Sequence, residues 1–141
     1  MDCVVGWVPL ADAGVGDVLD QFAGNKTLVA VRHVVQDEPD DRFLLGKDFN
    51  RGVAMLSDRN LAFDVLVYAR QLPATIEFVR NHHGLPMVLD HIAKPTILRA
   101  NGVDSAWERD FRELAKSPNL MCKFSGVVTE VRDADWTIDT I

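Results

Sequence analysis

The sequence predicts an α/β domain built on a parallel sheet, and two observations support this. Short apolar, β-branched runs alternate with stretches of helical spacing along the chain, and each run is apolar at consecutive positions, as in strands covered on both faces. The runs are 3–8, 28–35, 62–68, 86–92 and 120–128. They start about 29 residues apart on average, close to the ~31 residues of one strand–helix unit in an eight-fold barrel. Repeated units with right-handed crossovers give parallel pairing.

The clearest predicted helix follows Ser105. Trp107, Phe111 and Leu114 fall on one apolar stripe, with charged residues on the opposite face. Ser105 is the expected N-cap, because Glu108 follows it at the capping-box spacing.

Three further helical segments are expected between the other strands. One runs from 74 to about 82, and a shorter one covers 15–22. The segment 40–56 is predicted as two short helical pieces joined by a turn, because Gly46 and Gly52 interrupt its pattern.

Composition describes a globular protein and excludes two classes of partner. The chain has 141 residues, of which 48% are apolar and 26% charged, and a formal net charge of −6, which suits one domain with a real core. No apolar run approaches the ~20 residues of a membrane span. The acidic balance, without a basic cluster, disfavours nucleic acid. Cys3 and Cys122 lie in apolar runs and are predicted to be buried, reduced thiols of a cytoplasmic protein without an export signal.

Five strands fit either a complete, open, doubly wound sheet or part of an eight-stranded barrel. An open sheet binds ligands at one switch point, whereas a barrel gathers groups from the carboxyl ends of many strands. Polar or ionisable residues lie at the end of nearly every predicted strand of this chain, at 32–36, 68, 90–94 and 123–130. This distribution favours a barrel.

His91 is the most informative histidine. It ends an otherwise apolar strand, where burial is costly unless its nitrogens are satisfied, and it is flanked by Asp90 and followed by Lys94 and Pro95. Because side chains alternate along a strand, His91 and Asp90 cannot both point into a barrel. One faces the active site, and the other braces the loop or a neighbouring strand.

Arg32 and the other histidines have more ordinary interpretations. A strand arginine needs an anionic partner, either a protein carboxylate or a substrate. His33, the next residue, is expected to be a hydrogen-bonded core side chain. His82 and His83 are expected to be exposed at a helix carboxyl end, where the helix dipole suits imidazolium.

Four segments together resemble the amidohydrolase-2 group of the amidohydrolase superfamily, in its sugar-lactonase branch of the L-fuconolactonase and L-rhamnono-lactonase type. They are 31–36, 64–67, 89–95 and 122–130, which contain Asp-His-x-x-Lys-Pro and Lys-x-Ser-Gly in order. Membership implies a (β/α)8 barrel that hydrolyses a ring ester. The family's His-x-His and Gly-Ser-Asp-Trp-Pro motifs are absent from this sequence. The resemblance therefore implies a fragment: a single domain, 1–141, holding about strands three to seven of a partial TIM barrel.

The resemblance also implies site residues. His91 would be the catalytic histidine that contacts the substrate carbonyl. It would also be the only metal candidate, since a divalent metal such as zinc serves some complete relatives. Arg32 and Lys94 match cations that hold a substrate's carboxylate or hydroxyls, with Lys123 and Ser125 as weaker lining candidates.

Two other acidic residues near the end of the chain carry less weight. Glu130 is the weakest lining candidate. Asp135, with Trp136, imitates part of the missing last motif, but no strand precedes it, and no catalytic role is carried to it.

Two functions remain open. The first is a lactonase-type hydrolase of lactones or related carboxyl esters, inactive as this chain alone because the general base and first histidines are not encoded. The second is a short open-sheet protein that binds a small anion or a partner subunit without catalysis. No His-Glu-x-x-His, Cys-x-x-Cys, Gly-x-Ser-x-Gly or phosphate loop supports another hydrolytic class. Self-association through exposed sheet edges is also expected.

Overall fold

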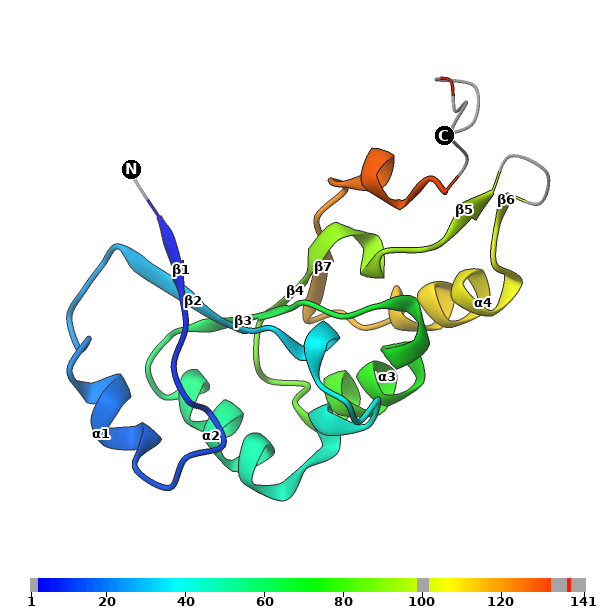
Figure 1. Cartoon of the computed structure of the whole chain (residues 1–141). Coiled ribbons are helices and arrows are strands. Elements are labelled where there is room, and N and C mark those ends of the chain that lie inside the picture. The colour runs from blue at the N-terminus through cyan, green and yellow to red at the C-terminus, as the bar shows by residue number, and fades with distance from the viewer. Residues whose placement is uncertain (1–2, 99–101, 133–136, 138–141) are drawn as a thin grey trace.

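A five-stranded parallel sheet forms the centre of the computed structural model, which describes residues 3–98, 102–132 and 137 (Figure 1). Its strands lie in the order β1-β2-β3-β4-β7, and every neighbouring pair is parallel. They are β1 (Val4–Gly6), β2 (Leu28–His33), β3 (Ala62–Val65), β4 (Met87–Leu89) and β7 (Leu120–Cys122). All five predicted strands are confirmed, each shorter than its apolar run.

The strand order decides between the two architectures. Each new strand adds to the same edge of the sheet, and right-handed crossovers then place every connecting helix on one face. Figure 1 shows the α-helices on one side of the sheet. They are α1 (Val15–Asp20), α2 (Lys47–Ser57), α3 (Leu72–Asn81) and α4 (Ser105–Leu114). A doubly wound sheet reverses its order and carries helices on both faces, so this sheet is part of a barrel wall.

On the other sheet face the described part of the chain forms no helix layer, which corrects the prediction that the strands are covered on both faces. Val4 in β1 is 49% exposed and Met121 in β7 is 69% exposed. A two-stranded antiparallel hairpin, β5 (Ile97–Leu98) with β6 (Gly102–Val103), was not predicted. Five short 3-10 turns complete the described chain: η1 (Val35–Asp37), η2 (Phe43–Leu45), η3 (Ala69–Gln71), η4 (Asp90–Ala93) and η5 (Val127–Glu130).

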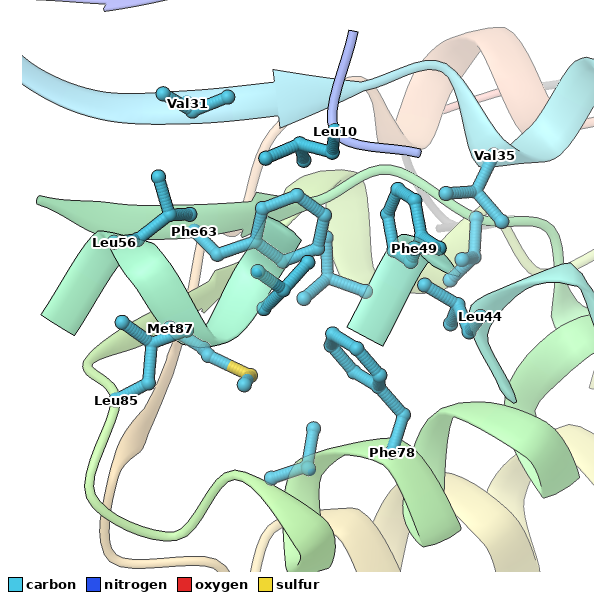
Figure 2. Close-up of a cluster of buried hydrophobic side chains, with 14 of the residues drawn as sticks. Leu10, Val31, Val35, Leu44, Phe49, Leu56, Phe63, Phe78, Leu85 and Met87 are labelled. Carbon is cyan, nitrogen blue, oxygen red and sulfur yellow. The ribbon is translucent and has the colours of Figure 1, made fainter. Parts of the chain in front are cut away.

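The core lies between the sheet and its helices (Figure 2). Phe63 of β3 points from the sheet toward Phe49 of α2 and Phe78 of α3, with ring centroids 5.9 and 5.7 Å away in edge-to-face contact. Each fully buried aromatic ring removes a large apolar area from water, worth on the order of 2 kcal/mol. A smaller cluster of Ile92, Ile97 and Val127 anchors the β5–β6 hairpin beside the sheet.

Segment 40–56 folds largely as expected, with one correction. The turn η2 and the helix α2 meet at Gly46, as predicted. Gly52, however, does not interrupt α2, because its role is close packing. A Cβ at this position would lie 1.9 Å from the carbonyl oxygen of Leu10.

Two further local predictions are wrong. Asp104, not Ser105, caps α4: its Oδ1 accepts a hydrogen bond from the Ala106 amide at 2.9 Å. Cys3 and Cys122 are both free and exposed, because β1 and β7 are the edge strands of the described sheet. Partial burial still raises the pKa of the Cys122 thiol. Among the described residues, no helix is long and apolar enough to cross a membrane.

His82 ends α3 as expected, but it is half-buried and not a solvated imidazolium. Its ring packs on Phe78, with the centroids 4.8 Å apart, and its Nε2–H donates to Asn50 Oδ1 at 2.7 Å. The amide of Asn50 is fixed in turn, because its Nδ2 donates to the carbonyls of Leu44 and Gly46. Burial lowers the pKa of His82 below its ordinary 6.5. The neighbouring His83 is exposed.

This burial predicts a loss of stability in mild acid. The unfolded chain takes up a proton on residue 82 near pH 6.5, whereas the folded protein does so only at lower pH. The free energy of unfolding therefore falls as the pH drops below 6.5, until the lower folded pKa is reached. Urea unfolding at pH 7.5 and 5.5 should show this fall reduced in His82→Gln and unchanged in His83→Gln. An identical fall in both variants would contradict the assignment.

Candidate functional site

The helix-free face of the sheet carries the charged residues. Arg32 of β2 lies opposite Asp64 of β3 in the parallel register. Because side chains alternate along a strand, their neighbours Val31 and Phe63 point into the core on the helix side. Asp90 follows β4 immediately and extends this row of charge to the carboxyl end of the next strand.

Four of these residues form one charge cluster: Arg32, Asp64, Asp90 and Lys123. Lys123, just after β7, donates from Nζ to a carboxylate oxygen of Asp64 and, at 2.7 Å, to Asp90 Oδ1. Arg32 Nη1 donates to Asp90 Oδ2 at 3.2 Å. Both carboxylates are buried, with exposures of 2% and 0%. Two cations thus neutralise two buried anions.

The carboxylates control the charge state of Lys123. Its partial burial alone would lower the pKa, but the hydrogen bonds and charges of Asp64 and Asp90 together outweigh burial and raise the pKa above the ordinary value. Lys123 is therefore a fixed ammonium at any physiological pH.

The charge cluster decides one prediction from the sequence, and it contains a residue, Asp64, that the sequence analysis missed. The expected anionic partner of Arg32 is a protein carboxylate, Asp90. Lys123, a predicted lining residue, forms ion pairs with Asp64 and Asp90. No role was assigned to Asp64 from the sequence. The signal that could have identified it is an acidic residue inside an apolar strand, because a buried carboxylate is costly without a cation.

The chain leaves β4 through a left-handed turn. Four consecutive residues that are not glycine have positive φ, with values of 52° at His91, 49° at Ile92, 58° at Ala93 and 48° at Lys94. Each such residue costs on the order of 1 kcal/mol, and strain of this kind concentrates at functional sites.

Hydrogen bonds and packing hold this turn in place. The Ile92 amide donates to the Lys123 carbonyl at 3.3 Å, and Trp107 Nε1 donates to the Ile92 carbonyl at 2.9 Å. Ile92 and Ala93 are buried. Because the strand ends at Leu89, simple alternation does not set the direction of His91.

His91 contacts Ser125 just beyond the carboxyl ends of the paired strands β4 and β7. Its Nδ1 lies 2.9 Å from Ser125 Oγ. Gly126 allows this approach, because a Cβ there would lie 3.3 Å from the His91 Nδ1 atom, and its φ of 70° suits glycine. Among the described residues, Nε2 of His91 has no hydrogen-bond partner. Asp90 instead forms ion pairs with Arg32 and Lys123. Asp90 is therefore the residue that braces other strands, which leaves His91 as the one predicted to face the active site.

Lys94 completes the group of sequence-predicted site residues. Its Nζ donates to Gln36 Oε1 at 2.5 Å and lies 5.2 Å from the centre of the Tyr68 ring. Neither Gln36 nor Tyr68 was assigned a role from the sequence, although each lies at the end of a predicted strand. The structure thus places Arg32, His91 and Lys94 at the carboxyl ends of β2 and β4, the two strands that flank β3.

Other candidates lie apart from this group. His33 packs on the helix side, stacked on Phe43 with its Nε2 2.7 Å from Glu38 Oε1. It is only partly buried, and its Nδ1 has no hydrogen-bond partner among the described residues, so the prediction of a hydrogen-bonded core side chain is confirmed only in part. Glu130 is buried beside Thr129 and Arg132. Asp135 and Trp136 lie outside the described residues.

The donor set does not form a metal centre by itself. The described part of the chain contains no cluster of three or more His, Cys, Asp or Glu side chains that could hold an ion. The carboxylates of Asp64 and Asp90 are already bound to Lys123. His91 remains a predicted metal ligand.

Comparison with known proteins identifies the family. The Amidohydro_2 family model, described as amidohydrolase, matches residues 4–141. The chain belongs to this amidohydrolase family.

Two L-fucono-1,5-lactonases are similar to this chain in sequence. The L-fucono-1,5-lactonase of Burkholderia multivorans is 42% identical over 137 residues, covering 94% of this chain and 45% of that protein. The L-fucono-1,5-lactonase of Burkholderia ambifaria is 37% identical over 127 residues, covering 90% and 43%. This amidohydrolase chain therefore spans less than half the length of both relatives.

Solved structures agree with part of a barrel. Two crystal structures of an amidohydrolase from Burkholderia multivorans, one with bound HEPES and one with bound zinc, superpose with TM-scores of 0.84 and 0.85 at 38% identity. Each match covers 94% of this chain but only 47% and 46% of the other protein. Amidohydrolase 2 from Bifidobacterium longum subsp. infantis, at 19% identity and a TM-score of 0.57, shares the fold.

Proposed function

We propose that this chain supplies the cationic half of a sugar-lactone hydrolase site. The observation that carries the proposal is the contact between His91 and Ser125 beyond the carboxyl ends of β4 and β7, next to the ion pair of Asp90 and Lys123. Ligand sites of β/α barrels lie at this end. The proposed substrate is a six-membered sugar lactone of the L-fuconolactone type, because both close relatives act on that class.

The geometry suits stabilisation of negative charge. When water adds to a lactone carbonyl, its oxygen becomes an anion, and breaking the ring C–O bond then gives a carboxylate, a free hydroxyl and a proton. His91 Nε2 would donate to this oxygen, while Ser125 fixes the ring through Nδ1. Asp64, Asp90 and Lys123 act as positioning residues that hold β3, β4 and β7 in register.

A complete site needs more groups than the described residues supply. No described residue stands as a free carboxylate facing His91, so the base that activates water is assigned outside the described residues. The proposal includes no metal step, although one solved relative binds zinc. We propose that the edges β1 and β7 pair with the complementary half of a barrel or with a second copy, and that the protein acts in the cytoplasm.

Recombining two halves tests this function. The chain would be produced together with the part of the Burkholderia multivorans lactonase that it does not match. Ring opening of L-fucono-1,5-lactone would then be measured through the proton that it releases. The mixture is expected to hydrolyse the lactone, while the chain alone leaves it at the uncatalysed rate. His91→Asn should reduce the rate of the mixture by about 100-fold, the usual effect of removing an oxyanion donor.

Two controls make this test decisive. His83→Asn changes an exposed histidine away from the site and should retain full activity. The two halves of the Burkholderia multivorans enzyme should themselves recombine and hydrolyse the lactone. If they do and the mixed pair does not, the proposed function is wrong. Equal rates for His91→Asn and the unmodified mixture would remove His91 from the reaction.

A further inference from the structure

The left-handed turn that carries His91 is strained at a residue poorly suited to it. Ile92 has a φ of 49°, and a positive φ in a β-branched residue is a genuine outlier. A glycine or an asparagine would adopt this conformation with less strain. The isoleucine is nevertheless buried, at 7% exposure. Its surroundings must therefore hold the strained backbone in place.

Both peptide groups that flank Ile92 are held by residues distant in the sequence. The Ile92 amide donates to the Lys123 carbonyl at 3.3 Å, and the Ile92 carbonyl accepts from Trp107 Nε1 at 2.9 Å. The first of these peptides joins Ile92 to His91, and the second keeps the turn from relaxing beyond Ile92. Because the Lys123 partner is a backbone carbonyl, the indole of Trp107 is the contact that a substitution can remove.

Trp107 is itself fixed by packing on two sides. It lies in the first turn of α4, and its ring stacks on Phe111 with the centroids 4.9 Å apart and the planes 19° apart. It packs against the main core and also against the small cluster of Ile92, Ile97 and Val127. The indole therefore joins the helix layer to the turn at the carboxyl end of β4. A side chain locked in this way holds the position of the group that it bonds.

His91 depends on this turn for its direction. Strand β4 ends at Leu89, so the pleat of the strand does not aim the histidine, whose own φ is 52°. Its Nδ1 lies 2.9 Å from Ser125 Oγ, and this one side-chain contact does not prevent the ring from moving with its backbone. A donor to a developing oxyanion must be held within about 0.5 Å of the productive geometry. The backbone after His91 must therefore be fixed as well.

We propose that Trp107 is a positioning residue for His91. Its N–H bond to the Ile92 carbonyl keeps the left-handed turn closed, and the closed turn aims His91 Nε2 at the substrate oxygen. Trp107 acts through the backbone of Ile92, without touching the lactone. The role in the reaction rests on the proposed function, whereas the coupling of Trp107 to the turn rests on the contacts alone.

Amide hydrogen exchange on the chain alone tests the coupling without requiring turnover. Trp107→Phe keeps an aromatic ring but removes the N–H donor. The amides of Ile92 and Lys94, both hydrogen-bonded in the folded turn, should exchange about tenfold faster in this variant, because the turn opens more often. Amides of α2 should keep their rates within about twofold, because the opening is local. Trp7→Phe is the matched control: it changes an exposed tryptophan after β1 and should leave the turn amides unchanged.

Kinetics of the recombined halves test the role in the reaction. Trp107→Phe is expected to lower kcat about tenfold and to change KM less than about twofold, because the turn aims a group that acts in the transition state. In the His91→Asn background, the same substitution should change kcat by less than about twofold, since the residue that it positions is already removed. A general loss of stability would instead lower kcat by the same factor in both backgrounds.

The outcomes separate this inference from the proposed function. Unchanged exchange of the Ile92 and Lys94 amides in Trp107→Phe, or an acceleration that is equal in α2, overturns the coupling. Faster exchange in the turn with an unchanged kcat, or an equal loss of kcat in the His91→Asn background, overturns the positioning role. If the turn loosens as expected but the recombined halves with the unmodified chain fail to hydrolyse the lactone, only the proposed function is overturned, and Trp107 remains the residue that closes the turn.

Discussion

Gly52→Ala is expected to destabilise the protein by about 3 kcal/mol, the upper range for overpacking a core. An added Cβ would lie 1.9 Å from the carbonyl oxygen and 2.8 Å from the carbonyl carbon of Leu10. Both are backbone atoms, so no side-chain rotation relieves the contact. Helix α2 would have to move away from the segment after β1, and Phe49 and Val53 would lose part of their packing.

A second helical glycine provides the control. A Cβ on Gly16 in α1 would meet only the Met55 sulfur, at the ordinary distance of 3.7 Å. Gly16→Ala should therefore stabilise the protein by roughly 0.5–1 kcal/mol through helix propensity. Urea unfolding followed by circular dichroism measures both changes. A Gly52→Ala midpoint equal to that of the unmodified protein would show that α2 shifts without loss.

The pattern of apolar runs was sufficient to locate the five strands because each strand buries one face under the helices. The same pattern did not show where the strands end. Apolar residues continue after Leu89, but the chain turns at Asp90, and no glycine or proline in 90–94 signals a left-handed turn. Only the Trp107 and Lys123 contacts, both distant in sequence, reveal why the turn holds.

The architecture depended on strand order, which composition does not encode. Five strands of this kind also form an open doubly wound sheet. Polar residues at several strand ends favoured the barrel, and this inference held because parallel strands added in sequence bring those ends together. The edge positions of β1 and β7 also explain why Cys3 and Cys122 are exposed although they lie in apolar runs.

The candidate site was predicted in its residues but not in its pairings. Arg32, His91 and Lys94 were identified from their places at strand ends. Their partners were not, because Arg32 and Asp90 are 58 positions apart, as are Lys94 and Gln36. An isolated acid such as Asp64 in an apolar strand shows that a cation must approach, without showing which one.

Lys123→Met is expected to cost about 3 kcal/mol, because it leaves Asp64 and Asp90 buried with fewer cations. Asp90 keeps its ion pair with Arg32, while Asp64 loses its only cationic contact among the described residues. This loss is at the low end of the range for a broken buried ion pair, because the lysine side chain is 40% exposed. Lys116→Met, which removes a surface pair with Glu113, should change the free energy of unfolding by less than about 1 kcal/mol.

A double-mutant cycle separates lost attraction from lost packing. Asp64→Asn removes the stranded charge, so adding it to Lys123→Met should recover part of the stability, whereas Asp64→Asn alone should destabilise. The raised pKa of Lys123 means that its contribution is present throughout neutral pH and is lost only as the pH rises through a folded pKa above 10.5. The difference between Lys123→Met and the unmodified protein should therefore stay constant from pH 7 to 9. Additive effects in the cycle would mean that Lys123 acts through packing alone, and the charge cluster would then have no role in holding β3, β4 and β7 together.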